Sequence, residues 1–166
     1  MTDQSEQIDD ATNPLDCVED ILAGQNWSFS RMNQDELMVD VSGKLGTYRM
    51  VLVWQEEFCA MQFTCHLDMI VPSDRRDLMA LALVQVNAAM WLGHFDLPAD
   101  TGVPCFRHTS LFRGQSGSGA DHLQDLMDIA LNECERVYPT FTLLSDICDM
   151  DENQLSLALS DTAGEA

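Results

Sequence analysis

The spacing of apolar positions along the chain predicts an ordered succession of helices and strands. Apolar residues recur every three or four positions in four segments, which are predicted to be helical: 14–24, 73–92, 120–138 and 140–148. Asn13 is the expected N-cap of the first helix. Pro139 is expected to break or kink the helix that precedes it, because proline lacks a backbone N–H group.

Six further segments are predicted to be β-strands: 27–32, 36–42, 47–55, 58–71, 95–98 and 103–113. In segment 58–71 one set of alternating residues is apolar and predicts a core face. The other set, which includes Gln62, Thr64 and His66, predicts a polar face. Segment 47–55 is apolar on both sides in its second half, as expected of a strand that is covered twice.

The short connections between these strands favour antiparallel pairing. We therefore predict an α+β fold, a two-layer domain in which an antiparallel sheet carries its helices mainly on one face. The predicted order is α-β-β-β-β-α-β-β-α. One such domain is expected over residues 13–150, after disordered acidic residues 1–12 and before an acidic, flexible tail at 151–166.

Eighteen consecutive residues, Leu78–Phe95, carry no formal charge in a chain whose net charge is −20. A helix that is apolar nearly all round must be covered on more than one side. We predict that a second subunit covers one side, so that the chain forms a homodimer. A membrane span is disfavoured by Gln85 and Asn87 near the centre of the segment. The residues predicted to form the partner-binding or dimer face are Met50, Leu52, Trp54, Asn87, Met90 and Trp91.

The acidic residues are concentrated at the two ends of the sequence. The chain has 166 residues with 28 acidic and 8 basic side chains, and residues 1–20 and 121–166 carry −17 of its net charge. A surface of this sign repels nucleic acid and anionic membranes, so we expect neither as a partner. The acidic ends serve either solubility or the binding of a basic protein partner.

No arrangement of residues in the sequence predicts catalysis or metal binding. The six cysteines and four histidines do not have the spacing of a zinc site, and no G-x-S-x-G motif is present. Glu56 and Glu57 are more typical of a solvated turn than of paired catalytic carboxylates. Cysteines in apolar surroundings and an N-terminus without a secretory pattern indicate a cytoplasmic protein. We expect no enzyme activity, no metal and no cofactor.

Three features each leave two interpretations open. Asn87 lies inside an apolar helix, where an unpaired amide would cost about 1–3 kcal/mol. It either hydrogen-bonds the backbone of a neighbouring loop or sets the register of a dimer seam. Arg75 and Arg76 are either surface residues of a first helical turn or a small basic patch that meets acids of a partner. The ten methionines either fill the core or form an adaptable binding surface.

Three segments give the chain a resemblance to a known family: LVWQEE at 52–57, VPSDRRDLMALALVQVNAAMWLGHFDL at 71–97 and VPCFRHT at 103–109. They combine a Val-Pro before the helix, an Asn inside it, a Gly-x-Phe after it and a later strand with Phe106 and Arg107. This pattern resembles the YbjN family of bacterial sensory transduction regulators over residues 15–140. The resemblance implies a fold similar to type III secretion chaperones, which are small, acidic, often dimeric and bind extended segments of other proteins.

Two classes of function remain open. The first is a non-enzymatic protein-binding module, a chaperone-like or regulatory adaptor that acts as a homodimer in bacterial signalling or stress response. Its partner would be basic or would expose an apolar segment. The alternative is a sensor that binds a small apolar effector between the sheet and the long helix. For that site Gln85, Asn87 and His66 are the only evident polar groups.

Overall fold

The computed structural model describes residues 12–114 and 119–146. The helices and strands of these ranges are α1 (Leu15–Gly24), β1 (Phe29–Asn33), β2 (Glu36–Ser42), β3 (Thr47–Gln55), β4 (Ala60–Leu67), α2 (Arg76–Ala88), β5 (His94–Asp96), β6 (Cys105–Leu111) and α3 (Ala120–Asp146). Two short 3₁₀ turns, at Glu56–Phe58 and Ser73–Arg75, precede β4 and α2. The predicted order of elements and the α+β class are confirmed. Of the predicted terminal segments, residues 1–11 and 151–166 lie outside the described ranges.

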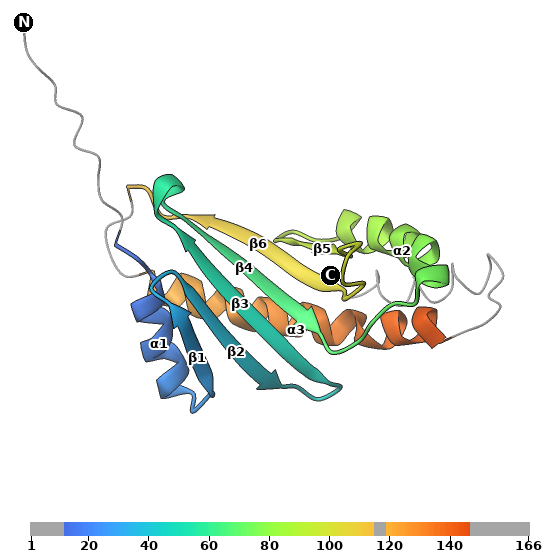
Figure 1. The fold of residues 1–166 in the computed structure, drawn as a ribbon, viewed down its shortest axis with the longest axis horizontal. Helices are drawn as coiled ribbons and strands as arrows, with labels where there is room; N and C mark the ends of the chain where they lie inside the picture. The colour runs from blue at the N-terminus through green and yellow to red at the C-terminus, as the bar shows by residue number, and fades with distance from the viewer. Residues whose placement is uncertain (1–11, 115–118, 147–166) are drawn as a thin grey trace, which may run out of the picture.

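The six strands form one sheet in the order β1-β2-β3-β4-β6-β5, and every neighbouring pair is antiparallel (Figure 1). Strands β1 to β4 follow one another through short turns, which is the connection that antiparallel neighbours allow. The chain then passes through α2 to the outer strand β5, and β6 returns between β5 and β4. The sheet therefore has β1 and β5 at its two edges.

The helices α1 and α3 cover one face of this sheet, and α3 passes behind the strands in Figure 1. Alternate residues of β3 and β4 are buried on this face: Tyr48, Met50, Leu52, Trp54, Met61, Phe63, Cys65 and Leu67. They share one core cluster with the buried residues of α3: Leu123, Leu126, Met127, Ala130, Cys134, Val137, Phe141 and Leu144. The predicted single helical layer is confirmed.

The opposite face of the sheet, which we call the open face, carries no helix among the described residues. Its residues on β3 and β4 include Val51, Val53, Thr64 and His66, which are half-buried. The polar face predicted for β4 is therefore confirmed. Strand β3 has apolar residues on both faces, as its sequence indicates, but helices cover only one of them.

The predicted break at Pro139 is absent, because α3 runs without interruption from Ala120 to Asp146. Proline removes the bond that its own N–H would donate to the carbonyl four residues earlier, and its ring crowds that carbonyl. The buried stripe of the helix continues across it, with Val137 before the proline and Phe141 after it. Burial of these side chains offsets the cost of an internal proline, which is about 3 kcal/mol.

Candidate functional site

Helix α2 has two apolar sides, and the rest of the described chain covers only one of them. Met79, Ala82, Leu83 and Val86 are buried on the side that meets β5 and α3. The residues on the other side, which we call the outer stripe, are Leu81, Val84, Ala88 and Trp91. The helix ends at Ala88, four residues earlier than predicted, so Trp91 lies just beyond it.

The outer stripe is strongly exposed. The exposed fraction is 59% for Leu81, 69% for Val84 and 77% for Trp91. The three helical members of the stripe follow one another at intervals of three and four residues, so they lie along one side of α2. Contiguous exposed apolar residues mark interaction surfaces, whereas single ones are ordinary. The outer stripe is therefore a candidate protein-binding surface.

Three of the six residues predicted to form a partner face lie in the core. Met50 and Leu52 are fully buried, and Trp54 is 4% exposed. They belong to the face of β3 that packs under the helices, because they alternate with the half-buried Val51 and Val53. In this fold they are not available to a partner.

The other three predicted residues lie in or after α2. The Asn87 side chain donates a hydrogen bond from Nδ2 to the Phe95 carbonyl at 2.9 Å and accepts one from the Phe95 N–H at 2.7 Å. Asn87 therefore hydrogen-bonds a neighbouring backbone, as one of its two interpretations held, but this backbone belongs to strand β5 and not to a loop. Met90 is half-buried against the core, whereas Trp91 belongs to the outer stripe.

On the open face, strand pairing places one histidine between two arginines. Arg49 of β3 lies opposite His66 of β4, and Arg107 of β6 lies opposite Thr64 of β4. Directly opposed residues point to the same side of a sheet, and diagonal neighbours are within reach of long side chains. His66 is therefore flanked by Arg49 on one neighbouring strand and by Arg107 on the other.

Each of these arginines is held by an aspartate. Arg49 donates two hydrogen bonds to the Asp40 carboxylate, from Nε at 2.8 Å and from Nη2 at 3.2 Å. Arg107 donates one from Nη1 to Asp96 Oδ2 at 2.9 Å. These bonds orient the two guanidinium groups, and they leave Nη1 of Arg49 and Nε and Nη2 of Arg107 without a partner among the described residues.

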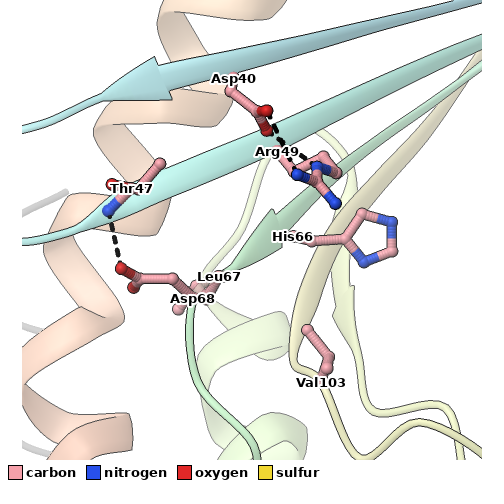
Figure 2. Close-up of a pocket in the computed structure, with 7 residues that line it drawn as sticks. All are labelled: Asp40, Thr47, Arg49, His66, Leu67, Asp68 and Val103. Atoms are coloured by element: carbon pink, nitrogen blue, oxygen red, sulfur yellow. Dashed lines mark hydrogen bonds and ion pairs between the residues drawn. The ribbon is translucent and has the colours of Figure 1, made fainter.

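A hollow of about 450 Å³ lies beside His66 on the open face. Figure 2 shows the residues that line it: Asp40, Thr47, Arg49, His66, Leu67, Asp68 and Val103. At its rim the Asp68 carboxylate accepts hydrogen bonds from the Thr47 N–H at 2.9 Å and from the Tyr138 hydroxyl at 2.8 Å. A second hollow, of about 250 Å³, lies around Thr64 and Arg107.

The electrostatics of the open face follow from this arrangement. Burial lowers the pKa of His66, and the positive charges of Arg49 and Arg107 lower it further. The imidazole is therefore neutral at neutral pH, with one nitrogen as a donor and the other as an acceptor. The hydrogen bond from Arg49 lowers the pKa of Asp40, so this carboxylate is ionised.

The polar groups expected between sheet and helix do not come together. The Asn87 amide is engaged by Phe95, Gln85 is exposed on α2, and His66 lies on the open face. No three His, Cys, Asp or Glu side chains of the described ranges are grouped so as to hold a metal ion. None of the helices in those ranges combines the length and hydropathy that a bilayer span requires.

Two sets of site residues were missed by sequence reasoning. Leu81 and Val84 belong to the uncharged run. They follow Met79 by two and five residues, which places them on the other side of a helix, and this spacing is the signal that could have identified them. Arg49 and Arg107 could not have been placed beside His66, because cross-strand register is not encoded in the spacing of any one strand.

The fold places the chain among α+β domains in which one helical layer packs against an antiparallel sheet. The chain belongs to the YbjN family, since the family model, described as "Putative bacterial sensory transduction regulator", matches residues 14–143. It is similar to the crystal structure of YbjN, a putative transcription regulator from E. coli, at 12% sequence identity and a TM-score of 0.49. That match covers 73% of this chain and 90% of the other. No curated protein matches the chain.

Proposed function

We propose that the chain is a non-enzymatic, regulatory protein-binding module that works as a homodimer in the bacterial cytoplasm. The outer stripe of α2 is the proposed dimer interface. The observation that carries this proposal is the exposure of Leu81, Val84 and Trp91 on an uncharged segment of a strongly acidic chain. Membership of a family described as sensory transduction regulators supports the regulatory role.

Charge favours a second copy as the occupant of the outer stripe. Two chains of net charge −20 repel each other, and the repulsion is weakest where uncharged surfaces meet. A two-fold dimer brings the same surface of both copies together, so an uncharged stripe meets an uncharged stripe. Full burial of a side chain of the size of Leu81 or Val84 contributes about 1.5–3 kcal/mol.

The regulated partner is proposed to be a protein with a basic surface or an exposed apolar segment. The solvent side of the helical layer carries exposed acidic residues, among them Asp16 and Asp20 on α1 and Asp125 and Asp128 on α3. Such a surface accelerates encounter with a basic protein and disfavours an acidic one. The five cysteines of the described ranges are free thiols, which supports a reducing compartment.

Photocrosslinking from the outer stripe tests the proposal. A photoreactive amino acid replaces Val84 in the full chain, and the protein is irradiated in bacterial lysate. The expected main product has twice the 18.6 kDa mass of the chain. The matched control carries the same group in place of Thr109, which is exposed on the open face and is expected to give no such product. A failure to obtain the dimer product from position 84, or equal yields from both positions, would overturn the proposed interface.

A further inference from the structure

We propose that the open face of the sheet binds a small molecule through an oxyanion group, a phosphate or a carboxylate, which is held over His66 between Arg49 and Arg107. The site lies on the opposite side of the sheet from the helical layer. It does not include the outer stripe of α2, so an experiment that contradicts the proposed dimer leaves this site untouched, and the reverse also holds.

The two arginines offer free N–H donors on the open face. The aspartates that hold Arg49 and Arg107 occupy part of each guanidinium, and three nitrogens of the pair remain without a partner in the described chain. Arginine recognises carboxylate and phosphate oxygens through such free N–H groups. The neutral His66 imidazole adds one more N–H donor between them.

The open face also carries polar side chains that have no hydrogen-bond partner among the described residues. Gln62, Thr64 and His66 lie on the central strand β4 and are half-buried, yet their side chains make no hydrogen bond to any other described residue. None of their polar atoms is among the buried unpartnered atoms of the described residues, so these groups are open to solvent. They can therefore bind a ligand that displaces this water.

Three aspartates lie near the proposed site and compete with an anionic ligand for the arginines. The carboxylates nearest the site are already engaged: Asp40 by Arg49, Asp96 by Arg107, and Asp68 by the Thr47 N–H and the Tyr138 hydroxyl. Asp40 and Asp96 are each balanced by an arginine, whereas the Asp68 oxygens are taken up by two neutral donors of the chain. The hollow beside His66 is lined by Arg49 and, at about 450 Å³, is within the size range of small-molecule sites. Arg107 lines the separate hollow of about 250 Å³.

Nuclear magnetic resonance of the His66 side chain tests this proposal in the full chain. Inorganic phosphate and acetate are titrated separately at constant ionic strength, with chloride as the balancing anion, and His66→Gln assigns the signal. Binding of either probe adds negative charge beside the ring and is expected to raise the pKa of His66 along a saturable curve. The stronger of the two responses identifies the oxyanion as phosphate or carboxylate.

Arginine variants decide whether the response comes from the proposed site. Arg107→Gln and, independently, Arg49→Gln are each expected to weaken probe binding by about tenfold or more. The matched control is Arg113→Gln, which removes an exposed arginine beyond the end of β6 and is expected to change binding by less than about twofold. The proposal is overturned if neither probe moves the His66 signals at about 10 mM, if chloride alone does so, or if Arg113→Gln weakens binding as much as the other two.

Discussion

At the scale of single residues, the Asn87 side chain fixes where α2 sits relative to the sheet. Its two hydrogen bonds hold the backbone of Phe95, whose ring packs edge-on against Phe106 of β6 and Phe141 of α3. One amide therefore joins α2 to the point where the sheet and α3 meet. Sequence reasoning identified the residue, because a polar side chain in an apolar helix must be satisfied.

We predict that Asn87→Ala lowers the free energy of unfolding by about 1–3 kcal/mol, because it leaves backbone groups of Phe95 without their partner. Urea denaturation followed by tryptophan fluorescence measures the change. Asn87→Asp keeps the acceptor for the Phe95 N–H but loses the donor, and it is expected to fall between the alanine variant and the wild type. Equal stability of Asn87→Ala and wild type would rule out this role.

A second prediction concerns His66 and pH. Because the folded state lowers the pKa of His66, the unfolded chain binds a proton at a higher pH than the folded chain does. Above the ordinary pKa of histidine, near 6.5, the imidazole is neutral in both states and the free energy of unfolding is unaffected. As the pH falls through that value, the unfolded chain takes up the proton first, and the free energy of unfolding decreases. His66→Gln should therefore lose less stability than the wild type between about pH 7.5 and pH 5.5. Identical losses in urea denaturation at the two pH values would contradict the assignment.

At the scale of elements, the turn between β2 and β3 is joined to α3 by one carboxylate. Glu135 Oε1 accepts hydrogen bonds from the backbone N–H groups of Lys44 at 2.7 Å and Leu45 at 3.3 Å. Gly43 permits this approach, because a Cβ atom there would overlap Glu135 Oε1 and lie 2.5 Å from the Tyr48 ring. The absence of a side chain at 43 is thus a packing requirement.

Gly43→Ala is expected to lower the free energy of unfolding by about 1–3 kcal/mol, the usual cost of an overpacked site. Gly24→Ala is the matched control, because a Cβ at that position meets nothing within 4 Å. The control is expected to be neutral or to stabilise by about 0.4–1 kcal/mol through the unfolded state. Thermal denaturation of both variants measures the difference, and equal effects would show that the turn is not packed as described.

Replacement of Pro139, in contrast to that of Gly43, is predicted to stabilise the folded chain. It is exposed and lies inside a continuous α3, where it costs one backbone hydrogen bond. Pro139→Ala restores this bond and is expected to raise the free energy of unfolding by about 1–2 kcal/mol, somewhat less than the full propensity difference. A destabilised variant would mean that the proline ring itself contributes to packing.

The same elements show what the sequence determines about this fold. The two-residue period of β4 places Thr64 and His66 on one face, and the apolar run of α2 requires a cover, so both features could be predicted. The face of β3 that meets the helices could not be predicted, because Met50 and Val51 are both apolar. The unbroken α3 depends on burial of Phe141, a tertiary contact that the local signal of Pro139 does not report. The position of Arg107 beside His66 depends on register, which is set by the whole sheet.

At the scale of the molecule, the chain divides its surface into three parts of different chemistry. The exposed side of the helical layer is acidic, the open face carries two paired arginines around a neutral histidine, and the outer stripe of α2 is apolar. We propose the outer stripe for a second copy, the acidic side of the helical layer for a basic partner, and the open face for a small oxyanion. Of the three surfaces, the outer stripe gives the strongest support for a partner, because contiguous exposed apolar residues mark interaction surfaces.

The central claim is therefore tested most directly by the molar mass of the intact chain in solution, measured by light scattering after size-exclusion chromatography at micromolar concentration. We predict twice the 18.6 kDa chain mass for the wild type. We predict the single-chain mass for a Leu81→Gln, Val84→Gln double variant whose circular dichroism is unchanged. A monodisperse wild-type monomer, or a dimer that the double variant leaves intact, would contradict it.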